Sequence, residues 1–166
     1  MKPFFAPVLF VLAFLTVFSF STHAQDSEKL LTKAARIHKA AFTVDSHTDT
    51  PLNFANKKFN VALDNSEVLS RSCVDFPRMQ KGGLDAVFFA VFTSQGPRTA
   101  EANAKIKVKA EAIFDSIYAA VNRNSNISGV ATTPEEAYKL VKKNKSVVFI
   151  GVENGYPIGN DISNVK

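Results

Sequence analysis

Cysteine and tryptophan are almost absent from this 166-residue sequence, which has a single cysteine, Cys73, and no tryptophan. One thiol cannot form an internal disulfide. Cys73 stands in the segment SCVDF, where we expect a small, half-buried side chain. A catalytic thiol would need a histidine partner that lowers its pKa, and the sequence shows no Cys-His arrangement. Thiol chemistry is therefore disfavoured.

A basic block interleaved with aromatic residues is also absent. The net charge is +5, but the lysines are scattered through helical stretches, as at Lys105, Lys107 and Lys109, which is typical of solvated helix faces. Nucleic-acid binding requires a concentrated basic patch, so we expect no nucleic-acid partner. Length and ordinary composition, with 46% hydrophobic and 21% charged residues, predict one globular domain.

The N-terminal segment is the longest apolar stretch. Lys2 precedes apolar residues up to Phe20, and small or polar residues then lead to Ala24. This order is typical of a secretory signal peptide, residues 1–24, cleaved after Ala24. The mature part, residues 25–166, is then periplasmic or secreted. The apolar stretch is close to the roughly 18 residues that span a bilayer, so we expect membrane contact only if the segment stays uncleaved.

The mature part alternates amphipathic segments with short apolar runs. Apolar residues at helical spacing predict helices, and nearly continuous apolar runs predict strands covered on both faces. Such alternation predicts an α/β fold with a parallel sheet and helical crossovers. We expect helices at residues 26–40, 74–80, 99–122 and from 133 onward, and strands at 42–46, 84–93 and 146–152.

Two of these strands end in residues that can bind metal. His47 and Asp49 follow the first strand, and Glu153 closes the last. If the extended conformation continues, His47 and Asp49 lie on one side, with Asp45 pointing the other way. The carboxyl ends of parallel strands line the active site of a (β/α) barrel, so Glu153 is expected to join them. Imidazole nitrogen and carboxylate oxygen are ligands that zinc accepts.

A purely structural reading of the first pair remains open. Aspartate near proline often forms a side-chain turn, and a histidine at a strand end is often only hydrogen-bonded. Glu153 favours the metal reading, because a carboxylate at the end of an apolar strand has few structural reasons to be there. Its two oxygens can bridge two cations.

Three stretches, taken in order, resemble the membrane dipeptidase (renal dipeptidase) family of zinc peptidases. DSHTDTP at residues 45–51 resembles the family's DGHNDLP motif, and VDFPRMQKGGL at 74–84 resembles its DLPR and GGV segment. IGVENGY at 150–156 resembles its IGVEGGH segment. The three matches have plausible spacing and together are far more specific than any one alone.

The resemblance implies a (β/α)8 barrel with two zinc ions. His47 and Asp49 would hold one zinc, and Glu153 would bridge both. A metal-bridging hydroxide would attack the peptide carbonyl of a dipeptide, with tolerance for a D-residue at its C-terminal position. Dimers are common in the family, so the resemblance also allows a homodimer.

The sequence departs from the family pattern in detail and in length. Serine, threonine, asparagine and tyrosine replace glycine, asparagine, glycine and histidine at positions 46, 48, 154 and 156. Family members are two to three times longer, and no histidine follows Glu153, so three of the five expected metal-contacting side chains are present. We therefore expect the N-terminal portion of a (β/α)8 barrel, truncated after about three strands and inactive alone.

Two other functions remain open. The chain could be a non-catalytic exported remnant or binding protein that retains the first part of the barrel. It could also belong to another class of metal-dependent barrel amidohydrolase. Those enzymes commonly carry His-x-His after the first strand, whereas the second position here is Asp49, which favours the dipeptidase.

Overall fold

The computed structural model describes residues 27–67 and 73–165, which fall into two compact units divided between Ala41 and Phe42. In the first unit residues 27–40 form a helix, and its apolar side chains Leu30, Leu31 and Ile37 are exposed. The predicted signal peptide, residues 1–24, lies outside the described residues. No helix in the described part is long and apolar enough to cross a membrane.

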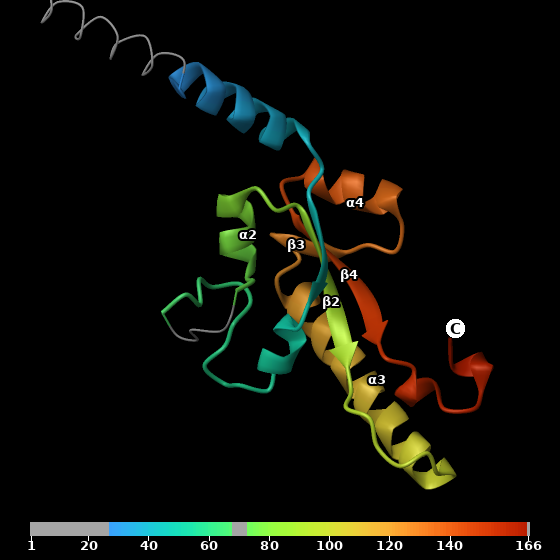
Figure 1. The fold of residues 1–166 in the computed structure, drawn as a ribbon. Helices are drawn as coiled ribbons and strands as arrows, with labels where there is room; N and C mark the ends of the chain where they lie inside the picture. Colours follow the sequence, from blue (N-terminus) through green and yellow to red (C-terminus); the bar gives the residue numbers. More distant parts are fainter. Residues whose placement is uncertain (1–26, 68–72, 166) are drawn as a thin grey trace, which may run out of the picture. The chain divides into compact units, whose positions relative to one another are not determined.

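The second unit is built on a parallel sheet with the strand order β1-β2-β4-β3 (Figure 1). β2 lies at its centre and pairs with β1 on one side and along its whole length with β4 on the other. The strands are β1 (Val44–Thr48), β2 (Ala86–Phe92), β3 (Ser128–Val130) and β4 (Ser146–Glu153). The α/β class and the parallel sheet predicted from the sequence are confirmed.

Three α-helices connect the strands, and each begins at a side chain that caps it. Asp75, Thr99 and Thr133 each accept a hydrogen bond from a backbone amide of the first turn. The helices are α2 (Phe76–Gly82), α3 (Ala100–Arg123) and α4 (Pro134–Val141), and short 3-10 turns form η1 (Thr50–Asn53), η2 (Tyr156–Ile158) and η3 (Ile162–Val165). Gly83 ends α2 with φ 69°, a left-handed conformation that glycine adopts without steric cost.

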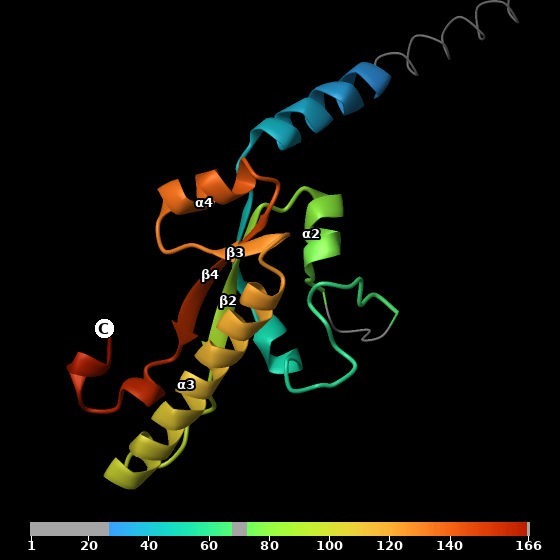
Figure 2. The same cartoon turned by 180° about the vertical axis from the view of Figure 1, so that it is seen from behind.

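The main core lies between the sheet and α3. Alternate β2 residues Val87, Phe89 and Val91 are fully buried and belong to one cluster with Ile117 and Val121 of α3. Figure 2 shows α3 running along this face of the sheet. The period of two in β2 and the helical period in α3 bring apolar side chains together across the same interface.

α4 packs beside the amino ends of β3 and β4. Ala137 of α4 is buried in a second cluster with Ala86 and Val147 of the sheet. Gly129 of β3 permits this approach, because a Cβ there would lie 2.7 Å from a Leu140 methyl group. A side chain at this position would require the Leu140 side chain to shift.

The sheet differs from the sequence prediction in two ways. Ser128–Val130 lie outside the predicted strands but form the short strand β3, so the sheet has four strands rather than about three. β1 begins at Val44 and continues through Thr48, which places His47 inside the strand instead of after it. Three residues of little apolar character gave no strand pattern to detect, and pairing with β4 decides their conformation.

Cys73 is exposed, and the prediction of a half-buried thiol is wrong. The buried segment begins one residue later, with Val74, Asp75 and Phe76. The sequence predicted that this segment is packed, but the residue at which burial begins is set by the contacts of the chain around α2.

β4 has a partly open edge. β3 pairs only with Ser146, Val147 and Val148, so on that side the rest of β4 has no strand partner among the described residues. A hollow of about 560 Å³ lies beside this edge, lined mainly by apolar residues. Its lining includes Phe88 and Phe149, whose rings stack 4.8 Å apart.

Candidate metal centre

An extra residue in β1 determines the face of the sheet on which the His47 side chain lies. Asp45 pairs with Val87 and Thr48 with Phe89, so three residues of β1 advance against two of β2. This bulge shifts the alternation of side chains, as bulges do. Thr48 then shares the face of Phe89, and His47 lies on the opposite face, that of Phe88.

Asp49 follows the strand without continuing it. It has φ −82° and ψ 18° and precedes the 3-10 turn η1, so the expected extended conformation does not reach this residue. Asp45 is not one of the three converging side chains. Its carboxylate Oδ1 accepts a hydrogen bond from the His47 backbone amide at 3.0 Å.

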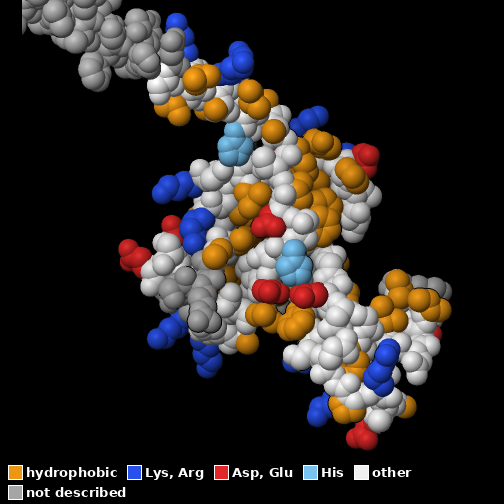
Figure 3. All heavy atoms as spheres, in the orientation of Figure 1, with side chains coloured by type: hydrophobic (Ala, Val, Ile, Leu, Met, Phe, Trp, Pro, Cys, Tyr) orange, Lys and Arg blue, Asp and Glu red, His pale blue; other side chains and the backbone are white. Residues whose placement is uncertain are grey.

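The predicted ligands converge although they come from strands on either side of β2. Nε2 of His47 lies 3.7 Å from Oδ1 of Asp49 and 3.3 Å from Oε2 of Glu153. One ligand atom from each of the three lies within 4.8 Å of the others, and the described residues contain no other such group. On the face drawn in Figure 3, a histidine adjoins acidic side chains with no lysine or arginine beside them.

These separations fit a shared cation. Two ligands at about 2.1 Å from a tetrahedral zinc lie roughly 3.4 Å from each other. The distances from His47 Nε2 to the two carboxylates, 3.3 and 3.7 Å, are close to this value. His47 and Asp49 are half-exposed, so a cation and its water can reach them.

The inner oxygen of Glu153 gives a second indication. Oε2 is buried and has no hydrogen-bond partner among the described residues, although Nε2 of His47 is 3.3 Å away. The two atoms are close, but they do not form a hydrogen bond of acceptable geometry. A buried carboxylate oxygen without a partner loses its solvation, and a cation between the two atoms would compensate for that loss.

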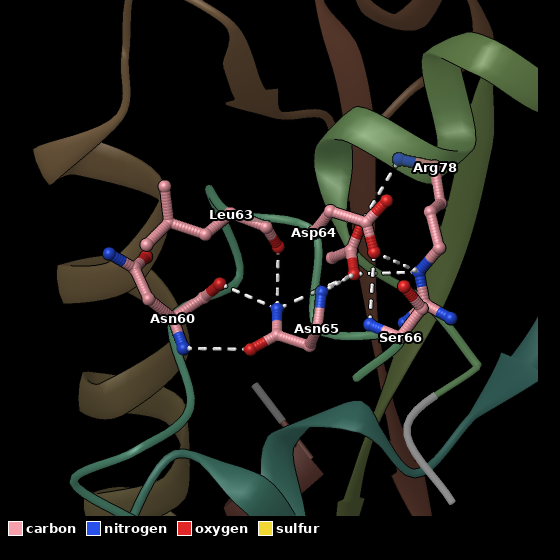
Figure 4. Close-up of polar contacts among 7 residues, drawn as sticks. Asn60, Leu63, Asp64, Asn65, Ser66 and Arg78 are labelled. Atoms are coloured by element: carbon pink, nitrogen blue, oxygen red, sulfur yellow. Dashed lines mark hydrogen bonds and ion pairs between the residues drawn. The ribbon is translucent and has the colours of Figure 1, made fainter. Parts of the chain in front are cut away.

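The loop that follows the first two ligands is held by a buried carboxylate, Asp75. Figure 4 shows Asn60, Asn65 and Arg78 in this hydrogen-bond network. Asp75 accepts hydrogen bonds from the Asn65 amide at 2.9 Å and from Nε of Arg78 at 2.7 Å. Asn65 itself donates to the carbonyl groups of Asn60 and Leu63. The sequence gave Asp75 only as part of a motif, and no local pattern identified Asn65 as its partner.

The turn after Glu153 carries a second polar group that the sequence prediction missed. Asn154 has φ 63°, and its side chain contacts the backbone of Thr93 and Tyr156. Asn-Gly is a common turn dipeptide, so residues 154–155 did signal the turn. Nothing local indicated which groups the Asn154 amide would bind.

The chain matches the membrane dipeptidase family, peptidase family M19, over residues 31–166. This range includes all three motifs and most of the chain. The chain belongs to the membrane dipeptidase family. The family assignment expected from the sequence is thereby confirmed.

Two solved structures share the fold of this member of the dipeptidase family. The probable dipeptidase PvdM from Pseudomonas aeruginosa has a TM-score of 0.70 and 22% identity, covering 83% of this chain. Dipeptidase AC, described as a metallopeptidase of family M19, has a TM-score of 0.56 and 18% identity, covering 74%. The chain spans 34% and 40% of those proteins, so its fold is a partial barrel that corresponds to part of theirs.

Proposed function

We propose that this chain carries part of the zinc centre of a dipeptidase, with His47, Asp49 and Glu153 as metal ligands. The observation that supports this most directly is the pairing of His47 Nε2 with the buried Glu153 Oε2 at 3.3 Å, without a hydrogen bond. Family membership supports the reaction class, hydrolysis of the peptide bond in a dipeptide.

Each ligand has a distinct role in this proposal. His47 supplies a neutral nitrogen, and Asp49 supplies a charged oxygen that offsets the charge of the first cation. Glu153 has two carboxylate oxygens and can contact two cations at once. A zinc ion held there would lower the pKa of water and polarise the substrate carbonyl group.

The remaining ligands are not in these 166 residues. The family pattern requires two further histidines, and no histidine follows Glu153 in the sequence. We therefore propose that this chain alone binds zinc weakly and does not hydrolyse dipeptides at a useful rate.

Zinc titration of the purified chain tests the ligand assignment. We expect one weak site, with affinity reduced by about tenfold or more in His47→Ala, because a nitrogen ligand is lost. His38→Ala is the matched control, since His38 is an exposed histidine in the helix at residues 27–40. Equal zinc affinity in the wild type and His47→Ala would reject the proposed site.

Dipeptide hydrolysis tests the second part of the proposal. The 166-residue chain should show no turnover with zinc present, and a longer polypeptide that adds histidines after further strands should be active. The activity should disappear when a chelator removes the metal. Full turnover by the 166-residue chain would contradict the inactivity that we propose.

We also propose that the protein is exported and that residues 1–24 are removed. The support is the charged start, the apolar stretch and Ala24 before Gln25. N-terminal sequencing of the protein from a secreting host should find Gln25 as the first residue. A chain that retains Met1 in the membrane fraction would instead indicate an uncleaved anchor.

A further inference from the structure

The chain leaves β4 and bends immediately after the proposed bridging ligand. Glu153 is the last residue of β4 and pairs with Phe92 of β2, and Asn154 follows with φ 63°. L-residues other than glycine seldom adopt this left-handed conformation, and asparagine is among those that tolerate it best. The backbone position of Glu153 therefore depends on what holds Asn154 in place.

The Asn154 side chain continues the connection between β2 and β4 beyond their last pair. Its Nδ2 donates a hydrogen bond to the carbonyl of Thr93, the residue that follows β2. Its Oδ1 accepts from the Tyr156 amide at 2.8 Å and from Nε2 of Gln95 at 3.2 Å. One amide group thus joins the ends of two neighbouring strands where the ladder stops.

Tyr156 also connects the segment after β4 to the loop after β2. Its hydroxyl donates to the carbonyl of Pro97 at 2.7 Å, and its ring is buried. The ring lies against Gly96, where an added Cβ would be 2.8 Å from the tyrosine oxygen. The loop after β2 therefore has a backbone shape that accommodates this one side chain.

We propose that Asn154 and Tyr156 form a clamp that positions Glu153 for metal binding. This inference rests on the proposed zinc site and adds two positioning residues that do not contact the metal. Asn154 fixes the backbone directly after the ligand, and Tyr156 fixes the β2 loop to which Asn154 is attached.

The two clamp residues are positions at which this sequence departs from the family motif. A glycine in place of Asn154 would supply the left-handed turn without a side chain, and a histidine in place of Tyr156 lacks the phenolic hydroxyl that reaches Pro97. Here the turn is held by side-chain hydrogen bonds instead. The rim of the site is consequently tied to the end of β2, which lies between the strands that carry the ligands.

Asn154→Gly tests the clamp with little risk to the fold, because glycine accepts φ 63° freely. In the metal-free chain, we expect exchange of the Tyr156 amide proton to accelerate about tenfold, since its side-chain acceptor is removed. We also expect zinc affinity to fall about tenfold, as for other groups that orient metal ligands. Tyr156→Phe should show the same trend with smaller changes.

Asn124→Ala is the matched control. Asn124 donates from its Nδ2 to the Ala120 carbonyl at the end of α3, far along the chain from the ligands. It should lower the melting temperature without changing zinc affinity. Unchanged Tyr156 exchange in Asn154→Gly would overturn the clamp, as would affinity losses that follow melting temperature alone in all three variants.

The design separates this inference from the proposed function. If His47→Ala binds zinc as the wild type does, the ligand assignment fails, while the hydrogen-exchange result still tests the clamp. If His47→Ala loses binding but Asn154→Gly keeps it, the metal site stands and the positioning role fails.

Discussion

Asp75 is the most deeply buried carboxylate of the described residues, with no exposed surface. It receives hydrogen bonds from the amides of Asn65 and Arg78 and from the Arg78 side chain. A buried charge is tolerated only when it is paired and hydrogen-bonded, and these donors meet that requirement. Asp75 thereby holds the loop that follows η1 against the start of α2.

Replacing Asp75 with alanine should destabilise the fold strongly. Breaking one side of a buried ion pair costs about 3–5 kcal/mol, and we expect about 3 kcal/mol here because Arg78 is still 24% exposed. Urea denaturation, followed by circular dichroism, measures the change in the free energy of unfolding.

Asp64→Ala is the comparison for that experiment. Hydrogen bonds from Ser66, and to a lesser degree the charge of Arg78, hold the pKa of Asp64 below its ordinary value. Its oxygen lies 3.7 Å from Nε of Arg78, but the side chain is exposed and screened by solvent, so Asp64→Ala should destabilise the fold much less than Asp75→Ala. Equal losses in the two variants would contradict the role of burial.

At the scale of elements, α4 begins with a reciprocal set of hydrogen bonds. The Thr133 hydroxyl accepts from the Glu136 amide, and the Glu136 carboxylate accepts from the amide and hydroxyl of Thr132 at 2.8 and 2.9 Å. The hydrogen bonds from Thr132 lower the pKa of Glu136 below its ordinary 4.5. The arrangement is a variant of the capping box, shifted by one residue.

Glu136→Gln should therefore change stability in a pH-dependent way. A carboxylate whose pKa is lower in the folded state stabilises that state above its unfolded-state pKa, and this contribution disappears as the pH falls through the folded value. We expect the variant to melt below the wild type at pH 7 and the difference to vanish as the pH falls below 4.5. Thermal melts from pH 7 to pH 3 measure it. A difference that does not depend on pH would show that the charge has no role.

Glu135→Gln is a close control, because Glu135 lies in the same first turn of α4, whereas the hydrogen bonds from Thr132 are to Glu136. Any general effect of negative charge near the positive end of the helix should appear in both variants. The difference in melting temperature between the two variants then gives the contribution that is specific to Glu136.

At the scale of the whole molecule, the open edge of β4 is the feature with the largest consequence for behaviour in solution. Unpaired strand edges next to apolar surface promote association with other chains. The stacked Phe88 and Phe149 rings and the hollow beside them add apolar surface at this edge.

We expect the isolated chain to associate as its concentration rises and Val152→Lys to reduce this association. Val152 lies on β4 beyond the part that β3 pairs with and is 46% exposed, so a lysine adds charge at the edge without opening the core. Sedimentation velocity measures the effect. Val108→Lys, on the exposed side of α3, should leave association unchanged. Equal association in both variants would exclude the β4 edge.

The sequence by itself determined the main helices and strands, the family and the three candidate ligands, but not the short strand β3. Apolar runs and helical spacing are local properties, and the motifs around His47 and Glu153 are short and ordered. The residues that flank those ligands belong to the same motifs and were identified from the same short patterns. The predicted burial of Cys73 was wrong, because the residue at which a buried segment begins depends on contacts with residues that are distant in the sequence.

Only the tertiary structure decided how the ligands meet. The bulge between Asp45 and Thr48 depends on pairing with β2, and it is this pairing that places His47 on the face of Phe88. The contacts of Asn154 with Thr93 join residues 61 positions apart in the chain. A local pattern cannot specify such contacts, because the register of neighbouring strands is set by the packing of the whole sheet.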